Sequence, residues 1–173
     1  MTVKDIYDYL NLIAPFDTAE EWDNCGLTVG SFNKEVKKIY IALVRGQVPE
    51  EEATINMPIG RSTKDRKKMA VCKDGKEAVT HFKVLQRFNK YTLLQIKIDT
   101  GRTHQIRVHL SEIGYPVIGD SVYSNGKNEF NVEGQMLHAQ KLEFKHPITQ
   151  EQINLEAPLP EYFKQILEQL SNV

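Results

Sequence analysis

Alternating apolar and polar residues predict several strands in the second half of the chain. In residues 91–99, Leu94, Ile96 and Ile98 alternate with polar residues, so one face of this strand is expected to be buried and the other wet. The run 78–88 precedes it after a two-residue connection, which is short enough for a hairpin. Further strands are predicted over residues 38–46, 136–144 and 152–157.

Apolar residues at helical spacing predict three helices. They cover residues 3–14, residues from about 103 to 113, and the C-terminal end of the chain from Pro160 onward. In the middle helix, Ile106 and Leu110 are expected to face the core. The last helix begins with a proline in its first turn, where the missing N–H carries no penalty.

The segments between these elements complete the expected architecture. Residues 47–60 contain two prolines and are interpreted as a connector, and residues 61–71 are interpreted as a polar basic loop. Strands mixed with peripheral helices predict an α+β fold with a mixed, mainly antiparallel sheet.

The charges along the chain are sharply segregated. The formal net charge of the whole chain is −1, yet residues 61–110 hold 13 Lys and Arg against 4 Asp and Glu. Such a segment is a candidate contact surface for a polyanion. The alternative is a solvated basic face. The density of hydrogen-bond donors at the end of this segment favours nucleic acid.

That donor-rich stretch is 99-DTGRTHQIRVHL-110. A strand ends and a helix begins within it, so free backbone N–H groups and Arg102 could bind a phosphate. His104 and Arg107 are three residues apart and share one helix face. The alternative interpretation is structural, with Arg107 paired to a buried acid.

Several other functions find no support in the pattern. His104 and His109 are five residues apart and diverge on a helix, and the chain has no Cys-x-x-Cys or His-Glu-x-x-His motif, so no metal site is expected. Its two cysteines suit a reducing compartment. Neither a membrane span nor a signal peptide is recognised, so a soluble cytoplasmic protein is expected.

A series of motifs carries a family resemblance. They are 40-YIALVRG-46, 58-PIGR-61, 77-EAVTHFKVL-85, 100-TGRTHQIRVHLSEIGYPVIGDSVY-123, 137-LHAQKLEFKHP-147 and 157-APLP-160. In this order and spacing, residues from about 38 to 170 resemble the second half of the pseudouridine synthases that modify uridines of large-subunit ribosomal RNA. The resemblance implies a partial pseudouridine synthase fold, an RNA partner, a base flipped into a pocket, and no cofactor.

The resemblance also implies roles for individual residues. Tyr40 corresponds to the active-site tyrosine that stacks on the target base, Arg107 to the arginine that pairs with the catalytic aspartate, and Leu137 to the apolar floor of the uridine pocket. The basic loop and the start of the middle helix are the expected RNA contacts: Arg61, Lys64, Arg66, Lys67, Lys68, Arg102, Thr103, His104 and Gln105.

The beginning of the chain departs from that family. The family's aspartate stands in a His-Arg-Leu-Asp type motif, which does not occur in this sequence. Residues 1–43 instead resemble the opening of the GTP cyclohydrolase 1 type 2 homologues (NIF-three-like proteins), without the histidines that bind metal in that family. A gene fusion or internal deletion would join this segment to residues 44–173, the C-terminal part of a pseudouridine synthase domain.

Two functions therefore stay open. The first is uridine-to-pseudouridine isomerisation of ribosomal RNA, impaired in this chain because the aspartate motif is absent. The second is a non-catalytic RNA-binding remnant. A truncated metal-binding protein is disfavoured because no histidine precedes His81. If Arg107 has no carboxylate partner, the chain should be marginally stable, and an uncovered sheet edge would permit self-association.

Overall fold

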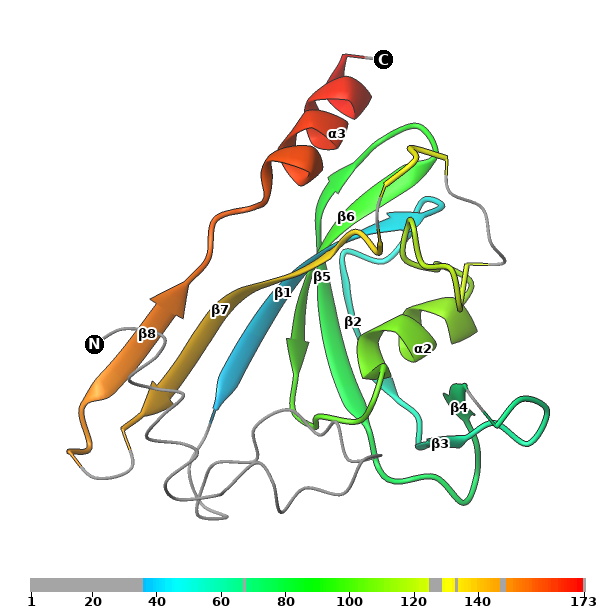
Figure 1. Ribbon diagram of the computed structural model, residues 1–173, viewed down its shortest axis with the longest axis vertical. Coiled ribbons are helices and arrows are strands. Elements are labelled where there is room, and N and C mark those ends of the chain that lie inside the picture. The colour runs from blue at the N-terminus through cyan, green and yellow to red at the C-terminus, as the bar shows by residue number, and fades with distance from the viewer. Residues whose placement is uncertain (1–35, 67, 125–128, 133, 147–148, 173) are drawn as a thin grey trace. The chain divides into compact units, whose positions relative to one another are not determined.

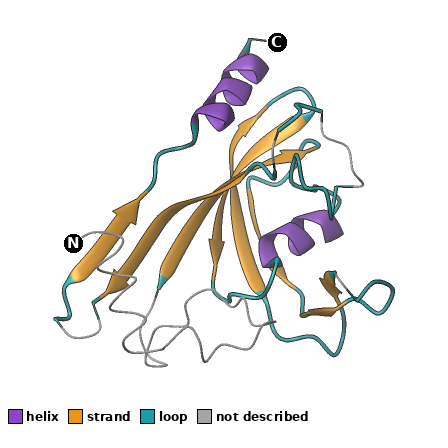
Figure 2. Ribbon diagram, viewed as in Figure 1, coloured by secondary structure: helices purple, strands orange, loops and turns teal. Residues whose placement is uncertain are grey.

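An antiparallel six-stranded sheet forms the centre of the structure, with the strand order β2-β5-β6-β1-β7-β8 (Figure 1). This computed structural model describes residues 36–66, 68–124, 129–132, 134–146 and 149–172, all within the compact unit Lys34–Val173. The strands are β1 (Lys37–Arg45), β2 (Glu52–Asn56), β5 (Val79–Arg87), β6 (Tyr91–Ile98), β7 (Leu137–Lys145) and β8 (Gln152–Glu156). The predicted α+β class and mainly antiparallel sheet are confirmed (Figure 2). The helix predicted over residues 3–14 lies outside the described residues.

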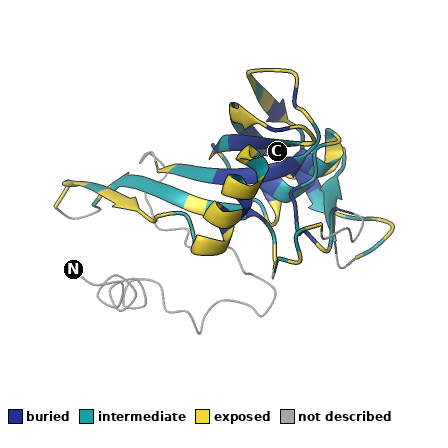
Figure 3. Ribbon diagram, turned by 90° about the horizontal axis from the view of Figure 1, so that it is seen from above, coloured by how far each residue is buried: buried dark blue, intermediate teal, exposed yellow. Residues whose placement is uncertain are grey.

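Strand β1 occupies an inner position and pairs antiparallel with β6 on one side and β7 on the other. Its second half, from Ile41 to Val44, is at most 3% exposed, so this run is apolar on both faces rather than alternating. Buried positions gather in this middle part of the sheet, whereas β8 is mostly exposed (Figure 3). The strand expected over 38–46 is confirmed. The expected junction between residues 1–43 and residues 44–173, as segments of different origin, would fall inside this strand.

The two faces of the sheet have different surroundings. Register places Lys38, Tyr40, Ile98 and Thr80 on one face. Helix α2 (Gln105–Glu112) covers this face: the side chains of Gln105 and His109 form hydrogen bonds with the Thr80 hydroxyl. We call it the helix face. The opposite side is the lysine face, which carries Lys37, Ile39, Lys83 and Lys97.

Strands β3 (Ile59–Arg61) and β4 (Met69–Val71) form a separate two-stranded hairpin. The hairpin packs on a small apolar cluster of its own, centred on Ile59, Ala78 and Val108. The sequence interpretation of this region is wrong in two places: β2 and most of β3 lie in the expected connector, and β4 lies in the expected basic loop. These strands have three to five residues, too few for alternation to be visible, and tertiary pairing forms them.

Helix α3 (Glu161–Ser171) ends the described chain. Phe163 is completely buried and Ile166 is 7% exposed, while Leu167 and Leu170 are partly buried against the same core, which confirms the predicted apolar stripe. Among the described residues, no helix is long and apolar enough to cross a bilayer.

Candidate functional site

Tyr40 and Leu137 come together on the helix face of the sheet. Tyr40 pairs with Ala139 across the β1–β7 ladder and Ala42 pairs with Leu137, so the two side chains are diagonal neighbours. Such neighbours lie about 7–8 Å apart, within reach of an aromatic ring. Both are half-buried against the core. Burial raises the pKa of Tyr40, so its phenol keeps its proton at neutral pH.

Arg107 is paired with Asp120 in a bidentate ion pair. Its Nε donates to Asp120 Oδ2 at 2.7 Å and its Nη2 donates to Oδ1 at 2.9 Å. The side chain of Asp120 has no exposed surface, and that of Arg107 is 12% exposed. Arg107 therefore has a buried carboxylate partner, as the structural interpretation of this residue expected, while its role beside a catalytic aspartate stays a prediction.

Further hydrogen bonds hold this carboxylate. The backbone N–H groups of Val122 and Tyr123 donate to Asp120 Oδ1 at 2.9 and 3.0 Å. Burial by itself would raise the pKa of Asp120, but the hydrogen bonds from Arg107 and from these two N–H groups outweigh it and lower that pKa. The hydrogen bond to Asp120 raises the pKa of Arg107. Both groups are charged over the whole physiological range.

The loop that carries Asp120 is attached to the sheet beside Leu137. Ile118 N donates to Leu43 O at 2.9 Å, and Met136 N donates to Ile118 O at 2.8 Å. Gly119 follows with φ 74°, and a Cβ there would overlap the carbonyl oxygen of Gly134. Only glycine fits this turn. The ion pair therefore lies at the end of the sheet where β7 begins.

Tyr123 is surrounded by groups from three parts of the fold. Arg107 Cζ lies 5.0 Å from the centroid of its ring, a cation–π distance, and the His104 ring meets it edge-on at 5.7 Å. Its hydroxyl is 3.0 Å from His104 Nδ1 and accepts from Met69 N at 3.1 Å. Burial, followed by the Arg107 charge, lowers the pKa of His104.

Other donors of the 99–110 stretch point into the protein. Gln105 is 3% exposed: its Oε1 accepts from the Thr100 hydroxyl and from Arg102 N, and its Nε2 donates to Thr80 Oγ1 and to the Val79 carbonyl.

His109 continues this network. It is completely buried, and its Nε2 lies 2.9 Å from the Met57 carbonyl. A carbonyl only accepts, so Nε2 carries the proton, and Nδ1 accepts from the Thr80 hydroxyl at 2.9 Å. These bonds are complete only for a neutral imidazole. Burial lowers the pKa of His109, which keeps it in that state.

The expected RNA contacts lie around the hairpin and the start of α2. Arg61 donates to the Arg66 carbonyl, Lys68 Nζ donates to the Val122 carbonyl, and Arg102 Nε donates to the Glu77 carbonyl. Lys64, Arg66 and Thr103 are exposed, whereas Gln105 is internal; Lys67 lies outside the described residues. The structure thus brings the hairpin and the α2 start together through Tyr123, whereas Gln105 does not share their exposed surface.

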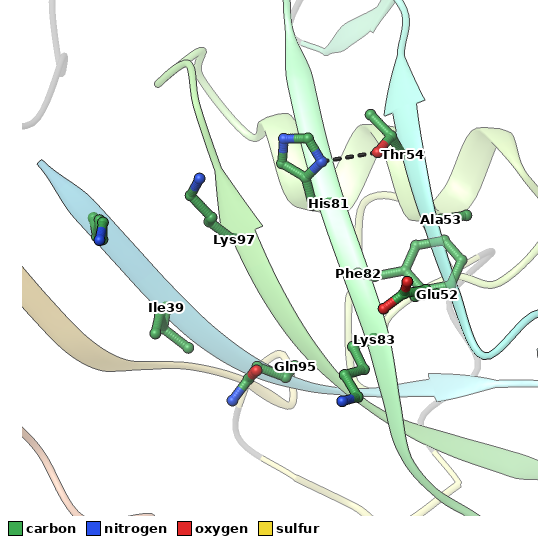
Figure 4. A pocket seen from close by; sticks show the side chains of 10 residues that line it. Ile39, Glu52, Ala53, Thr54, His81, Phe82, Lys83, Gln95 and Lys97 are labelled. Carbon is green, nitrogen blue, oxygen red and sulfur yellow. Dashed lines mark hydrogen bonds between the residues drawn. The ribbon is translucent and has the colours of Figure 1, made fainter. Parts of the chain in front are cut away.

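A concavity of about 500 Å³ lies on the lysine face (Figure 4). At its rim Thr54 Oγ1 lies 2.8 Å from His81 Nδ1, and His81 Nε2 lies 2.6 Å from Asp99 Oδ2. The hydrogen bond from His81 lowers the pKa of Asp99. Five lysines and four acids lie on this face by register, so its charges nearly balance: Lys37, Lys83, Lys97, Lys141 and Lys145 with Glu52, Asp99, Glu143 and Glu156.

The sequence interpretation assigned no role to Asp120 or Tyr123. Both lie in the quoted 100–123 block, but no local pattern announces an ion-pair partner 13 positions after an arginine. Among the described residues, no three His, Cys, Asp or Glu side chains are grouped to hold a metal ion.

Comparisons with known proteins show what the chain is similar to. The family model described as RNA pseudouridylate synthase matches residues 28–112. The chain is 47% identical over 162 residues to "Uncharacterized RNA pseudouridine synthase YlyB" of Bacillus subtilis, covering 93% of this chain and 52% of that protein. It is 44% identical over 146 residues to "Ribosomal large subunit pseudouridine synthase D" of Pseudomonas aeruginosa, covering 78% of this chain and 45% of that protein.

Solved structures give the same result for the fold. "Human RNA Pseudouridylate Synthase Domain Containing 1" superposes with a TM-score of 0.64 at 30% identity, covering 80% of this chain and 66% of that one. "Human RNA Pseudouridylate Synthase Domain Containing 4" superposes with a TM-score of 0.62 at 25% identity, covering 79% and 62%. The chain spans about half the length of the curated relatives it matches. By sequence and by fold, this chain is similar to RNA pseudouridine synthases.

Proposed function

We propose that this chain binds RNA of the large ribosomal subunit, using half of a uridine pocket, and does not isomerise uridine on its own. The proposal that the chain does not isomerise uridine rests on the Arg107–Asp120 ion pair. The resemblance assigns Arg107 to a catalytic carboxylate, and here both oxygens of its partner are already engaged inside the protein.

Asp120 is a poor substitute for the missing catalytic aspartate. Its side chain has no exposed surface and takes four hydrogen bonds, so neither a ribose nor a uracil carbon can approach its oxygens. Attack or proton abstraction would first require breaking a buried charge pair, which costs about 3–5 kcal/mol.

Base binding has better support. Tyr40 offers an aromatic ring and Leu137 an apolar surface on the same face, and aromatic stacking on a base contributes about 1–3 kcal/mol. The hairpin loop 61–68 adds five basic residues and one acidic residue beside the start of α2. Such a loop neutralises phosphates without reading sequence.

RNA binding is tested by titrating a uridine-containing RNA stem-loop at several salt concentrations. The charge reversal K64E/R66E should weaken binding and reduce the salt slope by about one for each phosphate that the loop no longer neutralises. The double reversal K90E/K145E is the matched control, since both lysines are exposed and lie outside strands β3 and β4. Equally weakened binding by the two variants would argue against an RNA contact through the hairpin.

Catalysis is tested separately, by tritium release from RNA that contains 5-tritiated uridine. We expect no release above background from the purified chain. Turnover that disappears in Y40F or R107A would establish the second candidate, isomerisation by this chain, which the identity to pseudouridine synthases favours.

Three finer points belong to the same proposal. The chain would act in the cytoplasm, together with ribosomal RNA. Residues 1–43 and 44–173 would derive from two genes. Self-association would use an edge of the sheet, and β8 is an edge strand with Leu155 41% exposed.

A further inference from the structure

Tyr123 is the point where the basic hairpin meets α2. Its hydroxyl bonds to Met69, the first residue of β4, and to His104, which precedes α2. Its own backbone is fixed from behind, because its N–H donates to Asp120 and its carbonyl accepts from Ser111 Oγ at 2.9 Å. One side chain thus ties two elements to a turn that an ion pair holds rigid.

Donor counting fixes the direction of one of the two hydroxyl bonds and allows the other to run from Tyr123 to His104. Met69 N–H can only donate, so Tyr123 Oη accepts there. The single phenolic proton is then free to point at His104 Nδ1, 3.0 Å away. This requires a neutral His104 with its remaining proton on Nε2. The groups facing His104 are Tyr123, the Arg107 cation and the Asp120 carboxylate.

The backbone of the hairpin is also attached to the chain before β5, through two hydrogen bonds of 2.9 and 2.8 Å between Ile59 and Lys76. The hairpin is outside the six-stranded sheet and packs on its own three-residue cluster, which Tyr123 borders together with Met69 and Val71. Lys68 Nζ adds one bond to the carbonyl of Val122, in the same turn as Tyr123. Tyr123 and Lys68 thus add side-chain hydrogen bonds between the hairpin and this turn to the direct packing of Ile59 on Val108 of α2.

His104 itself is held in an unusual backbone conformation. Its φ is 57°, in the left-handed region that non-glycine residues seldom adopt. The His104 side chain makes a hydrogen bond and an edge-on ring contact with Tyr123, and these contacts can offset the cost of the left-handed backbone.

We propose that Tyr123 is a positioning residue that couples the basic hairpin to the start of α2, so that both meet RNA as one preorganised surface. The RNA partner in this inference rests on the proposed function. Preorganisation improves affinity because the ordering of the hairpin is already complete before binding.

The test is Y123F, which removes the hydroxyl and keeps the ring against Arg107 and His104. Y91F is the matched control, because the Tyr91 hydroxyl bonds Glu129 elsewhere in the fold at 2.6 Å. Amide hydrogen exchange should accelerate about fivefold or more at Met69 in Y123F, and remain unchanged there in Y91F. Exchange in β1 and β6 should not change in either variant.

Two further readouts separate positioning from a general structural effect. The NMR titration midpoint of His104 should move to higher pH in Y123F, because its neutral form loses a hydrogen bond. RNA affinity should fall severalfold in Y123F with an unchanged salt slope, since the phosphates are still neutralised once the hairpin is ordered.

The outcomes are decisive for both claims. Unchanged exchange at Met69 together with an unchanged His104 midpoint overturns the coupling. A wild-type chain that binds no RNA overturns the proposed function, while exchange and titration still decide whether Tyr123 joins the two elements. A fall in salt slope in Y123F would also overturn positioning, because it would mean that the hydroxyl itself serves the binding of a phosphate.

Discussion

Replacing Asp120 by asparagine tests the energetics of the candidate site most directly. D120N keeps the size of the side chain but removes the charge that faces Arg107. It also presents amide protons to a guanidinium that has only donors. Because the side chain of Asp120 is fully buried and that of Arg107 is 12% exposed, the cation is left without compensation. We expect the free energy of unfolding to fall by about 3–5 kcal/mol.

The size of that loss decides how it is measured. A domain of this size has about 5–15 kcal/mol of stability in total, so the loss is a large fraction of it. Urea unfolding at low temperature, followed by far-UV circular dichroism, is therefore preferable to a thermal scan. R107M and the double variant D120N/R107M complete a cycle. We expect a coupling of about 2–3 kcal/mol, because the apolar replacement relieves the stranded charge.

The same pair predicts a dependence on acid. The folded-state pKa of Asp120 lies below its unfolded value of about 3.9, so its contribution to stability is complete above that pH. It is lost as the pH falls through the folded pKa. The stability difference between wild type and D120N should therefore shrink below about pH 4. A D120N loss under about 0.5 kcal/mol at pH 7, or additive effects of the two single variants, would refute the reasoning.

Two other predictions concern the residues that support the site. G119A should destabilise the fold by about 2–4 kcal/mol in urea unfolding, because the new Cβ overlaps the Gly134 carbonyl and φ is 74°; a change below about 0.5 kcal/mol would contradict it. The lowered pKa of His109 means that stability is complete above its unfolded pKa of about 6.5 and declines as the pH falls toward the folded pKa. H109Q removes the titrating imidazole, so the slope of unfolding free energy against pH, from about pH 5 to 6.5, should become shallower. The variant also loses the hydrogen bonds of His109 to Thr80 and Met57. An unchanged slope would assign the effect to other groups.

The sequence predicted best where periodicity was long. Residues 91–99 have three alternating apolar positions, and β6 follows them to within one residue. Edge strand β2, with the sequence EATIN, has one buried residue, Ile55, so no alternation identifies it. Its pairing with β5 depends on a partner strand that lies more than 20 residues away, which a local pattern does not contain.

Polar residues of the site were harder to interpret than apolar ones. Gln105 and His104 are adjacent donors in one motif, yet Gln105 is buried against β5 and His104 turns outward to Tyr123. Which way each points depends on the left-handed backbone of His104. Likewise, the charge on Arg107 was expected to need a carboxylate, but only the folded loop reveals that Asp120 supplies it.

The inner position of β1 has a consequence during synthesis. It is the first described strand to be made, and its partners β6 and β7 begin at Tyr91 and Leu137. At about 5–20 residues per second, several seconds separate completion of β1 from that of its first partner. During this interval the apolar run Ile41–Val44 has no neighbouring strand, so a nascent chain stalled before Tyr91 should be a good substrate for ribosome-associated chaperones.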